Sequence, residues 1–320
     1  MDTQIFAPKP TSPEGPWDTI IIGSGPAGFT AAIYTTRGAA STLILGGEVW
    51  GGQLMLTTTV DNFPGFPEGV LGPKLMEDMR IQAQRFGAQF QEVSVESVDL
   101  TKKPFEITAG GKTYQSRSII ITTGALTAWL TAPGVRELIG KGVSSCAPCD
   151  APFFKDKTVA VVGGGDSAME EASVLTKYAS EVTIIHRREE FRASAAMQEK
   201  VKSDPKIKIL WNTEVEEAVG SGKLEKLILK NNKTGQTSEL IVDGLFVAIG
   251  HKPDSDIFAG KLERDEKGYI EYKTDHCGTS VKGVFAAGDV VDKRYKQAVV
   301  SAGMGCIAAM EALKYLEEEG

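Results

Sequence analysis

Two glycine-rich turns constrain the fold of this chain more than any other sequence feature. GSGPAG, at residues 23–28, follows the apolar run DTIII, and GGGDSA, at residues 163–168, follows TVAVV; each opens a helical pattern. In such a turn the first glycine permits a sharp bend, the second admits a pyrophosphate to the backbone, and the third position lets the helix pack on the strand. Two such turns predict an α/β chain with two Rossmann-like dinucleotide-binding units. The positions concerned are Gly23, Gly25 and Gly28 in the first turn, and Gly163, Gly165 and Ala168 in the second.

The residues that follow the second strand of each unit indicate which nucleotide it binds. In the second unit that strand, EVTII, ends in His186, Arg187 and Arg188, with Arg192 four residues further on. A 2′-phosphate requires fixed positive charge and planar donors, which arginine supplies. The cluster therefore favours NADPH over NADH, with a solvated basic face as the alternative. In the first unit no acid ends the strand TLIL, so Glu48 in the glycine-rich loop beyond is only a candidate ribose contact.

The order of the strands predicts that one domain is inserted into another. SIIITTGA, at 118–125, follows the first unit, and GLFVAIGHKP, at 244–253, follows the second; each reads as a strand that ends at a glycine. The chain is expected to cross between domains at these two points. The predicted organisation is a tail at 1–16, a discontinuous domain at 17–125 and 254–320, and an inserted domain at 126–253.

A third strand end, near the C-terminus, carries another candidate cofactor-binding residue. The run VFAAGDVVD ends a strand at Gly288 and Asp289, and a helical pattern follows from about Gln297. An acid at this place can hydrogen-bond a ribityl hydroxyl, and the helix N-terminus can face a flavin carbonyl. The alternative for Asp289 is an ordinary turn or helix cap.

The stretch SSCAPCD places two residues between Cys146 and Cys149, and Asp150 comes directly after them. A zinc site needs further Cys or His ligands at suitable spacing, and Cys277 and Cys306 stand apart from one another. A structural disulfide that closes so short a loop stabilises little. The spacing is instead typical of a redox pair, in which one thiolate attacks and the other resolves. Asp150 can then give or take a proton, although a turn acid is the plainer interpretation.

A redox pair needs an electron source, and the two turns predict one. NADPH donates two electrons as hydride, a disulfide accepts two electrons, and a flavin can mediate between them. The sequence thus predicts a relay from NADPH to FAD, then to the Cys146–Cys149 pair, and finally to an external disulfide.

Bulk composition excludes several other classes. The net charge is −7 at pH 7, which argues against nucleic acid as the main partner. The N-terminus lacks a signal-peptide pattern, and no apolar run reaches about 18 residues, so no membrane partner is expected. Four cysteines in 320 residues do not suggest a secreted disulfide scaffold, and the cytoplasm is the expected location.

Several segments together resemble one family, the low-molecular-weight thioredoxin reductases. In chain order they are GSGPAG, GGQL, DNFPGFPEG, CAPCD, GGGDSAMEEA, HRREEFRAS, VAIGHKP, VFAAGDV and QAVVSAGMGCIAA, which span about residues 17–317. The resemblance implies two three-layer nucleotide-binding domains, with an NADPH domain inserted into an FAD domain, and usually a homodimer. It implies NADPH-dependent reduction of thioredoxin, with a large rotation of the NADPH domain between half-reactions. Cys149 would lie nearer the flavin, and Cys146 would attack thioredoxin.

The resemblance also extends the set of candidate ligands, with no metal among the cofactors. For FAD it implies Ser24, Gly25, Pro26, Ala27, Gln53, Asn62, Val95, Asp289, Lys296, Gln297 and Ala298. For NADPH it implies Gly165, Asp166, Ser167 and Ala168, together with His186, Arg187, Arg188 and Arg192.

Two positions depart from the family pattern. Lys296 stands where arginine is common, which keeps a positive charge, and Pro148 stiffens the spacer between the cysteines. Three rival flavoenzymes each lack a feature that is present here. A ferredoxin–NADP reductase of similar fold lacks the CxxC, while a dithiol oxidase and a ferredoxin-dependent reductase need no basic NADPH cluster. A non-catalytic redox sensor is a further alternative that no residue favours.

Overall fold

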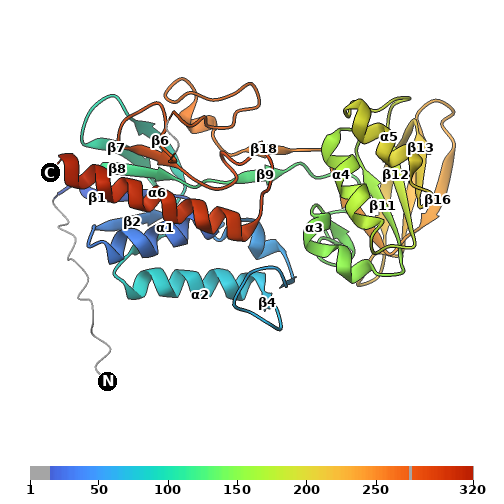
Figure 1. Cartoon of the computed structure of the whole chain (residues 1–320), viewed down its shortest axis with the longest axis horizontal. Coiled ribbons are helices and arrows are strands. Elements are labelled where there is room, and N and C mark those ends of the chain that lie inside the picture. The colour runs from blue at the N-terminus through green and yellow to red at the C-terminus, as the bar shows by residue number, and fades with distance from the viewer. Residues whose placement is uncertain (1–14, 274–275, 320) are drawn as a thin grey trace. The chain divides into compact units, whose positions relative to one another are not determined.

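The structure, a computed structural model, describes residues 15–273 and 276–319. The predicted tail at 1–16 lies, except for its last two residues, outside the described residues. The chain forms two compact units: unit 1 contains the residues up to Leu126 and those from Lys252 onward, and unit 2 is Thr127–His251. Figure 1 shows the elements of each unit.

Unit 1 is built around a seven-stranded sheet with the order β5-β2-β1-β8-β7-β6, in which β19 also pairs with β8. Strands β5, β2, β1, β8 and β19 run parallel, whereas β7 and β6 are antiparallel. Its elements are β1 (Trp17–Ile22), α1 (Pro26–Arg37), β2 (Thr42–Leu45), β3 (Thr59–Val60), β4 (Val70–Leu71), α2 (Gly72–Arg85), β5 (Gln89–Gln91), β6 (Val95–Asp99), β7 (Phe105–Ala109), β8 (Lys112–Ile121), β19 (Val284–Ala286) and α6 (Ala298–Glu319), with 3-10 turns at Gly52–Leu56 and Asp256–Phe258.

Alternate side chains of the parallel strands face the two outer layers of unit 1. Ile21 and Ile120 belong to the core under α1, α2 and α6, whereas Ile20 and Ile22 pack with residues of β6 and β7. Successive side chains of a strand point to opposite faces, so a run such as III must be buried on both. The result is three layers, of helices, parallel sheet and antiparallel strands, which hold the carboxyl ends of β1, β8 and β19 side by side.

Unit 2 repeats this plan. A parallel sheet has the order β10-β17-β11-β12-β13, and an antiparallel sheet has the order β14-β15-β16. Helices α3, α4 and α5 supply residues to the core on one face, and the antiparallel sheet covers the other. Its elements are β10 (Val143–Ser144), α3 (Ala147–Asp150), a 3-10 turn (Ala151–Phe154), β11 (Thr158–Val162), α4 (Asp166–Leu175), β12 (Glu181–His186), α5 (Ala195–Ser203), β13 (Ile207–Trp211), β14 (Thr213–Val219), β15 (Lys226–Asn231), β16 (Thr237–Ile241) and β17 (Gly244–Val247).

Two short strands join the units. β9 (Ala125–Thr127) and β18 (His251–Pro253) form a two-stranded sheet of their own at the two places where the chain crosses.

Within the described ranges, α6 alone is long and apolar enough to cross a membrane by length and composition. One face of α6 is buried against the unit 1 core through small residues such as Gly305, Ala308 and Ala312. The core helix of a soluble protein passes the same test of length and composition, so this single helix carries little weight.

Candidate active site

The first glycine turn leaves open space at one position and none at its neighbours. A methyl group added at Gly23 would overlap the carbonyl of Thr122, and one added at Gly28 would overlap the carbonyl of Gly23. At Gly25, which caps the N-terminus of α1, nothing lies within 4 Å of the added carbon. Pro26 follows as the first helical residue, where its missing N–H is not needed. The turn therefore presents open backbone at the positive end of α1, as a phosphate site requires.

Segments distant in sequence converge on this turn. The hydroxyl of Ser24 donates to the carbonyl of Gly46 at 2.6 Å and accepts from the amide of Gly51 at 2.9 Å, which ties the glycine-rich loop after β2 to the turn. Gly288, at a φ of 81°, lies beside Ala27; a carbon added to it would be 3.1 Å from the Ala27 side chain. The end of β19 and the first turn therefore line one place.

Asp289 is held at that place by a side-chain hydrogen bond. Ser301 of α6 donates to its carboxylate at 2.9 Å. Burial raises the pKa of Asp289, and the Ser301 hydrogen bond partly opposes this shift. A second acceptor oxygen remains for a hydroxyl ligand, since a carboxylate offers about four lone-pair positions.

Several of the remaining FAD candidates of unit 1 form hydrogen bonds with one another or with neighbouring loop residues. Gln53 donates to the carbonyl of Ala125 at 3.2 Å, and Asn62 donates to the side chain of Gln297 at 3.3 Å. The backbone amide of Lys296 donates to Asp292 at 2.8 Å, directly before α6 begins at Ala298. The Asn62 contact brings the loop between β3 and β4 to the segment directly before α6.

Glu48 belongs to the glycine-rich loop after β2, which contacts the residues directly before Val95. The amide of Gly47 donates to the carbonyl of Val93 at 3.1 Å, and that of Glu48 to the hydroxyl of Ser94 at 3.4 Å. Val95 begins β6 and packs against the core shared with β7. Its place beside the loop is fixed by the backbone, because its side chain points toward that core.

The second turn has the same geometry as the first. A carbon added at Gly163 would overlap the carbonyl of Ala248 and crowd Ala168, whereas at Gly165 nothing lies within 4 Å. Ala168, at the position that corresponds to Gly28 in the first turn, is fully buried. Asp166, the first residue of α4, accepts from the amide and hydroxyl of Ser194 at 2.8 and 2.9 Å, and Ser167 beside it is exposed.

The arginines after β12 are exposed side chains on a loop whose backbone is firmly held. Arg187, Arg188 and Arg192 are all exposed. The amide of Arg192 donates to the carbonyl of Gly164 at 2.7 Å, which joins this loop to the second turn. Asn212 donates to the carbonyl of Arg188 at 3.1 Å. Fixed backbone with free guanidinium groups suits an anionic ligand with little reorganisation.

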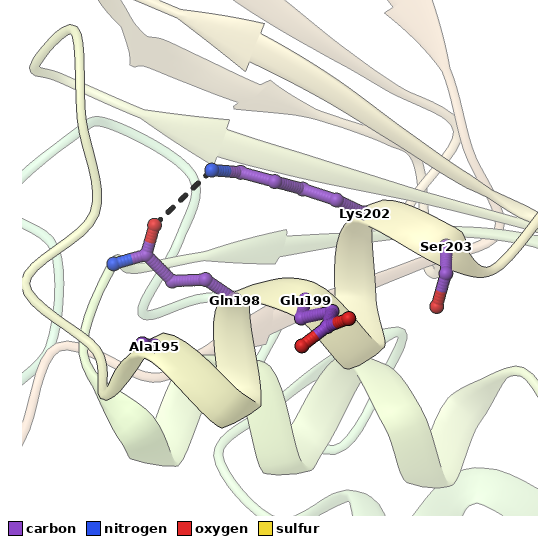
Figure 2. A pocket seen from close by; sticks show the side chains of 5 residues that line it. All are labelled: Ala195, Gln198, Glu199, Lys202 and Ser203. Carbon is purple, nitrogen blue, oxygen red and sulfur yellow. Dashed lines mark hydrogen bonds between the residues drawn. The ribbon is translucent and has the colours of Figure 1, made fainter.

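Helix α5 braces the same loop. The side-chain amide of Gln198 donates to the backbone carbonyls of Phe191 at 3.4 Å and Ala193 at 2.9 Å. Lys202 donates to the side-chain oxygen Oε1 of Gln198 at 3.1 Å. Figure 2 shows this side of α5, where an open hollow of about 540 Å³ is lined by Ala195, Gln198, Glu199, Lys202 and Ser203. All five residues come from one helix and no glycine turn reaches the hollow, so we regard it as a surface depression and place the chemistry at the two turns.

His186 does not lie with the arginines. Its side chain is 5% exposed, its ring packs beside Gly164, Phe191 and Trp211, and its Nε2 lies 3.0 Å from the carbonyl of Glu190. Burial lowers the pKa of His186, so the ring is neutral at neutral pH. The side chain therefore supports the second turn and the arginine loop from beneath and brings no positive charge to their surface.

Cys146 and Cys149 form a disulfide at the start of α3, with their Cα atoms 5.3 Å apart. The amides of Cys149 and Asp150 both donate to the carbonyl of Cys146, at 3.2 and 3.1 Å. Pro148 stands within the first turn of the helix, where a fixed φ favours this conformation. Both cysteines are partly exposed.

Two polar residues that the sequence did not single out surround this disulfide. Ser144 accepts from the amide of Cys146 at 3.1 Å and hydrogen-bonds Asp150, whose pKa is raised by burial. Glu171 of α4 accepts from the amide of Ala147. The sequence carried a signal for the second: Ala168, Ala172 and Leu175 form a buried helical stripe, and Glu171 falls on it.

In residues 15–273 and 276–319, no group of three or more His, Cys, Asp or Glu side chains is arranged to hold a metal ion. Cys277, which is free, is buried and hydrogen-bonded to Tyr272 at 3.6 Å, while Cys306 is partly exposed.

The fold and the cysteine pair define a nucleotide-dependent disulfide oxidoreductase, and a family model described as pyridine nucleotide-disulphide oxidoreductase matches residues 17–305. Thioredoxin reductase of Streptomyces clavuligerus is 50% identical over 301 residues, covering 93% of this chain and 94% of the relative. That of Rickettsia felis is 48% identical over 303 residues, covering 93% and 98%. A structure of thioredoxin reductase from Giardia duodenalis aligns with a TM-score of 0.90 at 42% identity, covering 94% and 99%.

The chain therefore belongs to the thioredoxin reductases of the pyridine nucleotide-disulphide oxidoreductase family. The predicted α/β fold and the predicted class of enzyme are confirmed.

Proposed function

We propose that this enzyme passes electrons from NADPH, through FAD, to the Cys146–Cys149 disulfide, and from there to the disulfide of thioredoxin. The observation that carries the proposal is the disulfide itself, which Asp150 follows directly in the sequence and which lies in the same unit as the second glycine turn and the exposed arginines. Unit 1 is then the FAD domain and unit 2 the NADPH domain.

The residues of unit 1 fit FAD. Open backbone at Gly25 suits a pyrophosphate, and Asp289 has an acceptor oxygen for a ribityl hydroxyl. A bound flavin supplies the chemistry of accepting a hydride and passing on an electron pair. The proposed ligands in unit 1 are Gly23, Ser24, Gly25, Pro26, Ala27, Gly28, Gln53, Asn62, Val95, Gly288, Asp289, Lys296, Gln297 and Ala298.

The residues of unit 2 fit NADPH. Open backbone at Gly165 suits the pyrophosphate, and Arg187, Arg188 and Arg192 suit the 2′-phosphate. Asp166 and His186 hold the turn and the arginine loop in place. Gly163, Ser167 and Ala168 complete the proposed site.

The two cysteines divide the work. Cys146 attacks the disulfide of thioredoxin and forms a mixed disulfide; Cys149 then attacks the sulfur of Cys146, which releases reduced thioredoxin and restores the Cys146–Cys149 bond. Asp150 directly follows Cys149, and burial raises the pKa of its carboxyl group, which favours a role as the acid that protonates a departing thiolate. Following the family resemblance, the NADPH domain rotates between the half-reactions, so that the pair serves flavin and thioredoxin in turn.

A homodimer is the proposed assembly, with the cytoplasm as its location and no nucleic acid or membrane partner. Val299, Ile307 and Met310 are exposed apolar residues along one stripe of α6, and Tyr34 of α1 lies beside Cys306 on that stripe. Such a stripe suits a second copy of the chain. Light scattering after size-exclusion chromatography tests this, and a monomer mass at micromolar concentration would contradict it.

The proposal is tested by turnover with NADPH and with NADH, using thioredoxin and, separately, the small disulfide 5,5′-dithiobis(2-nitrobenzoate). We expect a yellow protein whose flavin colour bleaches with NADPH, turnover with thioredoxin, and much weaker turnover with NADH. A colourless protein after reconstitution with FAD, or equal use of the two nucleotides, would contradict the assignment of the units.

A further inference from the structure

A carboxylate stands on an otherwise apolar stripe of α4. Ala168, Ala172 and Leu175 of this stripe are fully buried in the core beneath α3 and α5. Glu171 occupies the stripe between them, three residues after Ala168 and four before Leu175. Burying a carboxyl group costs free energy unless it has a partner, so this placement calls for a specific contact.

That contact is the redox turn. The Glu171 carboxylate accepts a hydrogen bond from the amide of Ala147, the residue directly after Cys146. Ala147 is itself fully buried and lies in the same core as α4. A helix of the NADPH unit thus holds the backbone between the two cysteines by a charge-assisted bond, which is stronger than a neutral one.

The charges that act on Glu171 are negative. The pKa of Glu171 is raised from 4.5 to about 7, chiefly by burial and also by the charges of Asp150 of α3 and Glu170 of α4, while the bond from Ala147 opposes the shift. Asp150 directly follows Cys149 in the sequence, and burial raises its pKa as well. The charge of Asp150 disfavours ionisation of Glu171 because like charges repel.

We propose that Glu171 is a positioning residue for the redox disulfide: it fixes the Cys146–Cys149 turn through the Ala147 amide. This inference rests on the proposed function, since it assumes that the pair reacts with substrate. It assigns Glu171 two separable effects. The acceptor oxygen sets the position of the turn, and the negative charge, where the group is ionised, disfavours a thiolate in the turn that Glu171 contacts.

Two substitutions separate these effects. Glu171→Gln keeps an acceptor oxygen for the Ala147 amide but removes the charge, whereas Glu171→Ala removes both. The matched control is Glu217→Gln, an exposed position on β14 of the same unit. All proteins are used as FAD-loaded full-length chains, and flavin content with bleaching by NADPH reports folding.

The first measurement is the rate of alkylation by iodoacetamide of each protein, reduced with dithiothreitol, as a function of pH. We expect Glu171→Gln to move the midpoint downward by about half a pH unit or more, because a negative neighbour of the thiols is lost. Glu217→Gln should superimpose on the unsubstituted enzyme. If the Glu171→Gln profile also superimposes, the effect of the Glu171 charge on the thiols is contradicted.

The second measurement is thioredoxin reduction at saturating NADPH. We expect Glu171→Ala to be slower by about tenfold, as for loss of a hydrogen bond to a charged group, and Glu171→Gln to restore most of the rate. An Ala variant as fast as the unsubstituted enzyme overturns the positioning role. If the unsubstituted enzyme itself does not reduce thioredoxin, the proposed function fails instead. Should the Ala variant fail to fold, the Gln alkylation profile still decides.

Discussion

The two dinucleotide turns share one backbone plan and differ in what surrounds them. Gly25 and Gly165 both cap a helix with open space around them, while Gly23 and Gly163 are both enclosed by a strand carbonyl. Around the first turn, Ser24 binds a glycine-rich loop. Around the second, a braced loop presents exposed arginines. The shared geometry supplies a phosphate site in each unit, and the strand-end loops decide which nucleotide enters.

The two units also differ in that the Cys146–Cys149 disulfide belongs to unit 2. Cys146 and Cys149 sit on α3, whose core is shared with the helix that starts at Gly165. Changing the cysteines should therefore have the largest effect of any substitution. We expect Cys149→Ser to lower thioredoxin reduction by more than about 1000-fold, because the redox pair is destroyed. Stopped-flow absorbance should show that NADPH still bleaches the flavin.

Cys306→Ser is the matched control, since Cys306 is a partly exposed thiol of unit 1. Its activity should match that of the unsubstituted enzyme. Retained thioredoxin reduction in the Cys149→Ser protein would contradict the role of the pair.

The next prediction neutralises one arginine in the loop after β12, the basic strand-end loop of unit 2. Arg188→Gln should raise the KM for NADPH by about 10- to 100-fold, because a charge-assisted bond to the 2′-phosphate is lost, with little change for NADH. Steady-state kinetics with both nucleotides measure this ratio. Arg136→Gln, an exposed arginine elsewhere in unit 2, should leave it unchanged.

The shared geometry can be tested by filling the open space in each turn. Gly25→Ala should weaken FAD binding and Gly165→Ala should raise the KM for NADPH, each by about tenfold, because the methyl group occupies the approach of the pyrophosphate. Fluorescence titration of the apoprotein measures the first effect. Both variants should unfold in urea like the unsubstituted protein, since neither methyl group meets an atom within 4 Å.

Gly28→Ala supplies the contrast to Gly25→Ala. Its methyl group would overlap the carbonyl of Gly23, so it should lower the free energy of unfolding by about 1–3 kcal/mol. Equal stability of the Gly25 and Gly28 variants would contradict the geometry described for the turn.

The last prediction concerns the pH dependence of stability at Glu171. Its pKa is raised from 4.5 to about 7, so the folded state holds the proton more tightly than the unfolded chain. The stability that this group contributes is fully present below pH 4.5 and is lost as the pH rises through 7. Urea unfolding should thus find Glu171→Gln more stable than the unsubstituted protein by about 3 kcal/mol at pH 8.5, and by about 1 kcal/mol or less near pH 5. A difference independent of pH would contradict this shift.

Strand–turn–helix context made the two glycine turns predictable from sequence. Short runs rich in β-branched residues, such as III and VAVV, are typical of buried strands, and glycines at the spacing of Gly23, Gly25 and Gly28 follow the first run directly. The strand runs at 118–125 and 244–253 end close to the places where the chain passes between unit 1 and unit 2.

Side-chain direction was harder to predict. His186 reads as part of a basic cluster, yet strand alternation turns its ring into the core beneath Gly164 while Arg187 and Arg188 continue into the exposed loop. Glu171 was missed because its partner is the Ala147 backbone amide, which leaves no mark in residue identities.

The most direct test of the whole account is an anaerobic titration of the FAD-loaded protein with NADPH, followed by flavin absorbance and thiol content. The unsubstituted chain should accept one electron pair more than Cys149→Ser, and the additional pair should appear as two thiols that Cys149→Ser does not form. Equal electron uptake by the two proteins would show that the Cys146–Cys149 disulfide does not receive electrons from NADPH, and would contradict the account.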